Sequence, residues 1–222
     1  MFSGSFETFA TGMTGTTGVG LSLRALSAAL LAGVAIKLVD DYIDREVDEI
    51  SGRYSLAAVL EGALIPYALL CAALACALDS PLASSLIIGS YIVGMLHDLD
   101  EVFPSGFSAR LESLLAGALG VIILGWKAIL SSVILMLGVQ LVDDIVDYLR
   151  GGITAGRNYA RAFGCVESGA AALACIILGL ILNSSMTIVV LVAFLVLVAG
   201  ERVLERVLVA RSKGKGWAIR DS

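Results

Sequence analysis

The chain has 222 residues, of which 58% are hydrophobic and only 16% are charged, and its mean hydropathy is +0.93. Soluble domains are typically about 45–50% apolar and about 25% charged, so the composition indicates an integral membrane protein. The net charge of −5 argues against nucleic-acid binding, which needs a basic surface. Four cysteines lie in apolar runs without C-x-x-C spacing, so we expect buried apolar side chains rather than redox or metal-binding groups.

Charge, glycine and proline divide the chain into an N-terminal arm, seven apolar segments and a basic tail. Residues 1–20 contain no Lys or Arg, which predicts an arm rather than a signal peptide. A spanning helix takes about 20 apolar residues. The seven segments, of which the third and fourth are short, are Leu21–Asp48, Leu56–Leu78, Leu82–Leu96, Leu111–Leu124, Ala128–Leu149, Tyr159–Leu182 and Met186–Arg211. We therefore predict an all-α fold, with one domain of about seven transmembrane helices over 21–211 and a cytoplasmic tail over 212–222.

The distribution of basic residues predicts how this bundle is oriented. Seven spans place 13 of the 15 Lys and Arg residues on one side of the membrane, leaving only Arg24 and Lys127 near the other. Basic residues are enriched on the cytoplasmic side. We therefore expect a multi-pass protein of the cell membrane whose basic side, with the acidic motifs described next, faces the cytoplasm.

A short acidic pattern occurs twice. LVDDYID at 38–44 matches LVDDIVD at 141–147 with an offset of 103, and GRY at 52–54 is echoed by GRNY at 156–159 with an offset of 104. Both acidic motifs end a span that enters the same side. Duplicated halves with a functional site between them explain this pattern, and chance similarity of two short acidic pieces is the alternative.

Each acidic motif places its aspartates on one face of a helix. At 100° per residue, the first cluster falls within an arc of about 100°. Its members are Asp40, Asp41, Asp44 and Asp48. The second cluster occupies the same angles with Asp143, Asp144 and Asp147. Carboxylates at a helix C-terminus face the negative end of the helix dipole and repel one another at i,i+4, so an absent cation is favoured over a merely solvated helix end.

The chemistry of these residues predicts a metal–phosphate site. Carboxylates are hard oxygen ligands that suit Mg²⁺, which usually bridges to substrate phosphates. Residues predicted to add positive charge or hydrogen bonds for a diphosphate are Lys37, Arg53, Arg110, Arg157, Arg161 and Tyr91. His97, the single histidine, lies in HDLDE, where a solvated loop position is favoured over metal ligation.

The first cluster resembles the N-D-x-x-D-x-x-x-D motif of the UbiA superfamily of intramembrane prenyltransferases. Asp143-x-x-x-Asp147 resembles the second D-x-x-x-D of that superfamily, and Arg53 resembles its basic residue after the first motif. The segment from Tyr91 to Gly120 is similar to the region between the motifs. The resemblance, over roughly Lys37 to Arg161, implies a helical bundle with a central cavity open to lipid.

The same resemblance implies an activity and a mechanism. Mg²⁺ ions held by both motifs bind a prenyl diphosphate, ionisation gives an allylic carbocation, and a lipophilic acceptor attacks it. The acceptor is an aromatic ring, a quinone precursor or a lipid. The resemblance implies that the catalytic aspartates are Asp41, Asp44, Asp143 and Asp147.

Two departures from the superfamily leave alternatives open. The leading Asn of the family motif is Asp40 here, so both clusters have the pattern D-D-x-x-D, which soluble prenyl diphosphate synthases and class I terpene cyclases also use. The family typically has nine spans, whereas this sequence predicts about seven. An intramembrane terpene cyclase or prenyl-chain synthase is therefore the alternative, a divalent-cation transporter is a further one, and homo-oligomerisation is left open.

Overall fold

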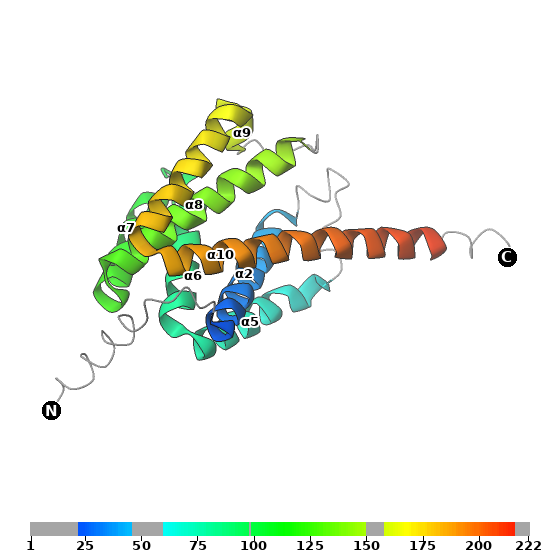
Figure 1. Cartoon of the computed structure of the whole chain (residues 1–222), viewed down its shortest axis with the longest axis horizontal. Helices are drawn as coiled ribbons and strands as arrows, with labels where there is room; N and C mark the ends of the chain where they lie inside the picture. Colours follow the sequence, from blue (N-terminus) through cyan, green and yellow to red (C-terminus); the bar gives the residue numbers. More distant parts are fainter. Residues whose placement is uncertain (1–21, 46–59, 98, 150–157, 216–222) are drawn as a thin grey trace.

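The computed structural model describes residues 22–45, 60–97, 99–149 and 158–215. Over these residues the chain forms helices, and its one β-type pairing is a single bridge between Val102 and Ser108. The α-helices are α2 (Leu23–Ile43), α5 (Leu64–Leu78), α6 (Ser80–Gly94), α7 (Ala109–Leu124), α8 (Trp126–Leu149), α9 (Tyr159–Phe163) and α10 (Cys165–Lys215), with short 3-10 helices η1 (Glu61–Ala63) and η2 (Met95–His97) (Figure 1). The predicted all-α class is confirmed.

Several predicted boundaries lie within a few residues of those observed, and one predicted segment is wrong. The span expected over Tyr159–Leu182 is interrupted at Gly164, whose φ of 102° is a left-handed conformation that glycine adopts without steric cost. The interruption separates the short α9 from α10. At the other end of the chain, α2 ends at Ile43 with Asp44 as its C-cap, and Asp48 lies outside the described residues.

Helix α10 consists of two segments joined at Asn183. The backbone there is not helical, with φ −156° and ψ 87°. The Asn183 side-chain oxygen accepts a hydrogen bond from the Met186 amide at 3.1 Å, which caps the new helix start. We call residues 165–182 the first segment of α10 and residues 184–215 its second segment. The break lies where the sequence predicted one span to end and the next to begin.

Small residues allow the helices to pack closely. A Cβ added to Gly89 of α6 would lie 2.9 Å from the Ser132 backbone of α8. On another face of α8, a Cβ on Gly138 would lie 3.1 Å from Cys175 in the first segment of α10. Helix α8 is therefore held between α6 and α10.

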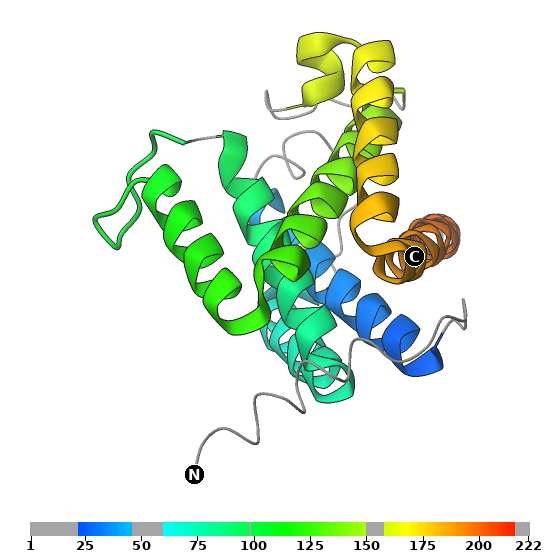
Figure 2. The same cartoon turned by 60° about the vertical axis from the view of Figure 1, so that its left-hand side comes forward.

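The second segment of α10 crosses the bundle and packs on α2, as the two views of the molecule show (Figures 1 and 2). The main core lies where these two helices meet α5, α6 and α8. Its buried residues are Ala29, Ala32, Ala75, Ala83, Leu86, Leu135, Met186, Val189, Val190 and Ala193.

Two helical stretches in the described part of the chain are long and apolar enough to cross a membrane, by length and composition. They are Trp126–Leu149 and Cys165–Leu204, the latter including the break at Asn183. Helices α5 and α6 are apolar but shorter, with 15 residues each.

Candidate functional site

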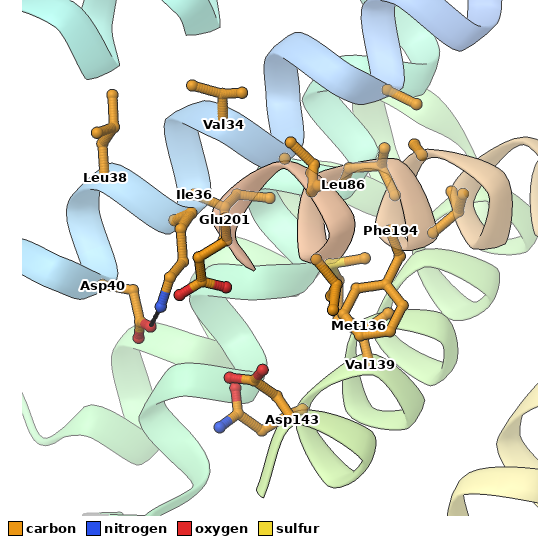
Figure 3. A pocket seen from close by; sticks show the side chains of 18 of the residues that line it. Val34, Ile36, Leu38, Asp40, Leu86, Met136, Val139, Asp143, Phe194 and Glu201 are labelled. Atoms are coloured by element: carbon orange, nitrogen blue, oxygen red, sulfur yellow. Dashed lines mark hydrogen bonds and ion pairs between the residues drawn. The ribbon is translucent and has the colours of Figure 1, made fainter. Parts of the chain in front are cut away.

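A cavity of about 260 Å³ lies between α2, α8 and the second segment of α10. Its wall is apolar over most of its depth, formed by residues such as Ile36, Val139 and Leu197. Its polar lining residues gather at one end, where the C-terminal part of α2 and the acidic part of α8 face each other (Figure 3). A cavity with a charged end and an apolar body is complementary to an amphiphile with a charged head and a hydrocarbon tail.

Three helices each contribute a carboxylate to the charged end of the cavity. Asp40 comes from α2, Asp143 from α8 and Glu201 from the second segment of α10 (Figure 3). Lys37 and Gln140 complete the polar lining. The sequence analysis predicted the two aspartates and Lys37 to lie in one site, and the structure brings these three together.

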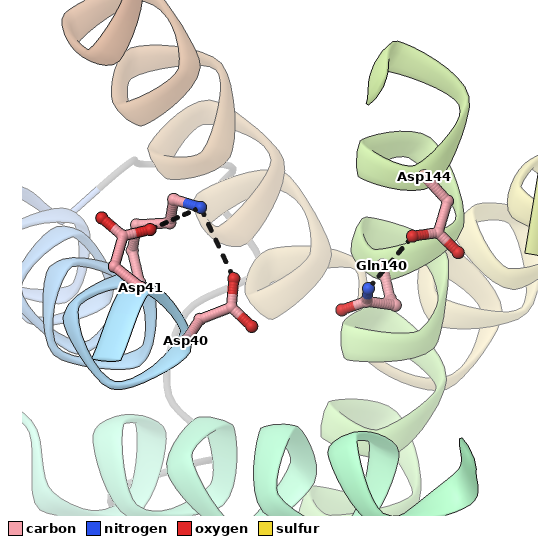
Figure 4. Close-up of polar contacts among 5 residues, drawn as sticks. Asp40, Asp41, Gln140 and Asp144 are labelled. Carbon is pink, nitrogen blue, oxygen red and sulfur yellow. Dashed lines mark hydrogen bonds and ion pairs between the residues drawn. The ribbon is translucent and has the colours of Figure 1, made fainter. Parts of the chain in front are cut away.

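Lys37 is held by the two leading aspartates of its own helix. Its ammonium group lies 3.0 Å from Asp41 and 3.4 Å from Asp40 (Figure 4). Asp41 is buried with only 8% of its surface exposed, whereas Asp40 is exposed. A buried carboxylate is stable only with a partner, so the ion pair with Lys37 stabilises Asp41, whereas Asp40 is part of the cavity lining.

Asp144 on α8 is the counterpart of Asp41 and is equally buried, at 7% exposed. One of its oxygens accepts a hydrogen bond from the Gln140 amide at 3.3 Å, and the other accepts one from the Tyr159 backbone N–H at 2.8 Å (Figure 4 shows the first). The Asn158 side chain donates to the Asp144 carbonyl at 2.8 Å. The bonds from Tyr159 and Asn158 tie the start of α9 to the end of α8, so Asp144 has a structural role in the described fold.

The two acidic helix ends therefore share one arrangement. In each, the second aspartate is buried and bonded to the residue four positions earlier, which is Lys37 for Asp41 and Gln140 for Asp144. In each, the first aspartate lines the cavity. Asp44 and Asp147 lie one turn further on, outside the cavity lining, and both have additional interactions in the structure.

The other residues predicted to bind a diphosphate lie away from this cavity or outside the described residues. Tyr91 donates a hydrogen bond to Glu112 of α7 at 2.5 Å, and Arg110 pairs with Asp100 in the loop before α7. Arg161 is an exposed residue of α9 that is not part of the cavity lining. Arg53, Arg157 and the predicted metal ligand Asp48 fall in segments that the structure does not describe.

Sequence reasoning missed Glu201. It lies beyond the acidic motifs in ERVLER at 201–206, where two Glu–Arg pairs resemble an ordinary solvated helix end. One signal was available: an offset of 104, the one that relates the two GR pairs, places Glu201 opposite His97 in the sequence. That match alone does not mark a site residue, because His97 is a different residue type for which the sequence favours a loop position.

The oxygen-rich lining is the kind that Mg²⁺ prefers. The carboxylates of Asp40 and Asp143 fit as ligands because both line the cavity from different helices. Both oxygens of Asp144 and one oxygen of Asp41 are already engaged by protein donors. Over the described residues, no three acidic, His or Cys side chains are gathered tightly enough to form a ready-made metal site.

Comparison with known proteins identifies no relative: no protein-family model, no curated protein and no solved structure matches the chain.

Proposed function

We propose that the chain is an Mg²⁺-dependent intramembrane prenyltransferase, which moves a prenyl group from its diphosphate to a lipophilic acceptor. One observation carries the proposal. Asp40 and Asp143, the leading aspartates of two matching motifs, line the charged end of a cavity whose body is apolar. A diphosphate with divalent metal fits the charged end, and a hydrocarbon tail fits the body.

A membrane setting is supported by the outward apolar side chains. Helix α7 exposes Leu114, Leu115, Ile122 and Ile123 at 52–76% of their surfaces. Contiguous exposed apolar surface of this kind is rare on soluble monomers and suits contact with lipid. We propose that the bundle spans the cell membrane several times, with the charged end of the cavity at the cytoplasmic side.

We also infer that the bundle consists of two pseudo-repeated halves. Every buried residue of α2 corresponds to a buried residue of α8 at the offset of 103. The pairs are Ala28 and Ser131, Ala29 and Ser132, Ala32 and Leu135, Ala35 and Gly138, Leu38 and Leu141, and Asp41 and Asp144. Matching burial over a whole helix is much harder to obtain by chance than a shared short acidic pattern.

The correspondence continues into the next two helices at an offset of 104. The buried residues of α5 are Leu64, Ala68 and Ala75, and their counterparts Ser168, Ala172 and Gly179 are buried in the first segment of α10. Four of the five buried residues of α6 have buried counterparts in the second segment: Ala83 and Thr187, Ser85 and Val189, Leu86 and Val190, and Gly89 and Ala193.

The turn between the second and third helices is also repeated. Asp79 (φ −147°, ψ 88°) accepts a hydrogen bond from the Leu82 amide, and Asn183 (φ −156°, ψ 87°) accepts one from the Met186 amide. The two caps are separated by the same offset of 104. We therefore assign α2, α5 and α6 to one half and α8 with both segments of α10 to the other, with the cavity between them.

Within the proposed mechanism, the chain's residues bind and orient the substrate. Bound Mg²⁺ would supply charge stabilisation for the departing diphosphate. Asp40 and Asp143 would hold the metal, and the Lys37 ammonium lies beside Asp40, where it would neutralise phosphate charge. The C–O bond breaks with its electron pair on the diphosphate. The acceptor then supplies the electron pair of the new bond to the allylic carbon and loses a proton.

Diphosphate release in nanodiscs tests this function. Purified protein is mixed with labelled prenyl diphosphates and Mg²⁺, with and without membrane-lipid extract as the source of acceptor. We expect Mg²⁺-dependent release that Asp40→Ala and Asp143→Ala reduce by about 100-fold or more, because each change removes a side-chain oxygen that would hold the charge acting on the reacting group. Release unchanged in both variants would refute the proposal.

The same incubation separates the alternatives. A cyclised or elongated hydrocarbon formed without acceptor would identify a cyclase or chain synthase at the same site. Divalent-cation flux into proteoliposomes, without any binding of prenyl diphosphate, would identify a transporter. The buried residues at the inner end of the cavity support a substrate pocket over an ion path through the bundle.

A further inference from the structure

The inner end of the cavity is closed by the tightly packed core. Ala29, Leu86, Val190 and Ala193 line the cavity, and each has at most 4% of its surface exposed. All four belong to the main hydrophobic core. We call these four residues the cavity floor. A tail that enters from the charged end therefore meets packed side chains from α2, α6 and α10 at the inner end.

The distance from the charged end to the floor is short. Ala29 precedes Lys37 by about two turns of α2, which corresponds to roughly 12 Å along the helix. The cavity volume agrees with this depth. A cavity of about 150 Å³ accommodates benzene, with six carbons. The cavity here, of about 260 Å³, is thus large enough for roughly ten carbons.

We propose that the cavity selects a short prenyl tail of about two isoprene units, and that the floor residues set this limit. The proposal rests on the function proposed above and narrows its substrate class. Leu86 is the largest side chain of the floor and comes from α6, whereas Ala29, from α2, has one of its smallest side chains. Changing these two side chains in opposite directions must move the limit in opposite directions.

Leu135 provides a matched control for Leu86. Both leucines are buried, at 2% and 3% exposed, and both belong to the main core. Leu135 does not line the cavity; it lies against Gly179 in the first segment of α10. Leu135→Ala therefore removes the same atoms from the same core without enlarging the cavity.

The test is a series of prenyl diphosphates with 5, 10, 15 and 20 carbons, assayed for diphosphate release in nanodiscs. One methylene too many in a closed apolar pocket reduces kcat/KM by about tenfold or more, so we expect the 10-carbon substrate to exceed the 20-carbon one by at least that factor. Leu86→Ala should raise the ratio of 15- to 10-carbon turnover by about tenfold. Ala29→Leu should lower 10-carbon turnover and retain that of the 5-carbon substrate. Leu135→Ala should leave all the ratios unchanged.

Equal turnover of the 10- and 20-carbon substrates by the wild-type protein would overturn the proposal, as would floor variants that change all lengths alike. Absence of diphosphate release at every length would refute the proposed function instead. The tail limit is then decided by thermal shift with prenyl thiodiphosphates: stabilisation by 10 carbons but not 20 supports it, and stabilisation that grows up to 20 carbons overturns it.

Discussion

Asp143 and Asp144 are adjacent in sequence, yet we expect their replacement to affect different properties: stability for Asp144 and diphosphate release for Asp143. Asp144→Ala removes the acceptor for the Tyr159 N–H at 2.8 Å and for the Gln140 amide at 3.3 Å. A hydrogen bond to a charged group contributes about 1.5–3 kcal/mol to the free energy of unfolding, and a buried donor left without an acceptor lowers it further. The bond from Gln140 is long and contributes little, so we expect Asp144→Ala to lower the free energy of unfolding by about 3 kcal/mol. In a chain of this length that corresponds to a fall in Tm of about 6–12 °C.

Asp143→Ala should behave differently, because Asp143 lines the cavity and is only partly buried. We expect its Tm to remain within about 2 °C of the wild type, while diphosphate release is lost. Tryptophan fluorescence during heating in nanodiscs measures both variants. An unchanged Tm for Asp144→Ala would refute the structural role of the bonds to Tyr159 and Gln140. A large fall in Tm for Asp143→Ala would contradict its place at an open charged end.

Three further predictions follow from the same geometry. Lys37→Gln should change the free energy of unfolding by no more than about 1 kcal/mol, because Gln140 holds Asp144 in this way, and it should weaken diphosphate binding about tenfold by loss of a charged donor. Lys37→Met should instead lower the free energy of unfolding by about 1–3 kcal/mol, because buried Asp41 loses its partner, and equal melting of both variants would contradict this. Gly89→Ala should lower stability by about 1–3 kcal/mol in the same melting assay, because the added Cβ would lie 2.9 Å from the α8 backbone, and a neutral effect would mean that α6 and α8 can separate without cost. Chelation of Mg²⁺ should abolish diphosphate release, with recovery on adding the metal back, and full activity in chelator would exclude the metal.

Much of the helical framework follows from the sequence because apolar runs and their interruptions are local signals. The end of α8 at Leu149 and the start of the last segment near Met186 were both predicted. The break at Gly164 was not, since a single glycine in the stretch YARAFGCVESGA, which contains no proline, is also tolerated inside a helix. Its positive φ arises from how α9 folds back on the end of α8, which is a tertiary effect.

The candidate site was also predicted only in part from the sequence. Helical angles predicted that the aspartates of each motif share a face, but they could not separate the buried members from those lining the cavity. That distinction depends on the neighbouring helices, which place Asp41 and Asp144 in contact with protein and leave Asp40 and Asp143 at the opening. Glu201 was missed because a third wall comes from a helix that carries no acidic motif.

The two acidic motifs differ at the residue that contacts the buried aspartate, which is Lys37 on α2 and Gln140 on α8, and this difference has a consequence for the orientation of a bound diphosphate. Two identical halves would hold a diphosphate equally well in either of two orientations related by half a turn. A positive charge on α2 alone makes these orientations unequal, since the more negative end of the ligand is drawn toward α2. The leaving group would then depart along one wall, and the reactive carbon would always face the other. Under the proposed function, the charge on Lys37 would therefore set one orientation of the bound substrate, and the acceptor would approach the reactive carbon from one side only.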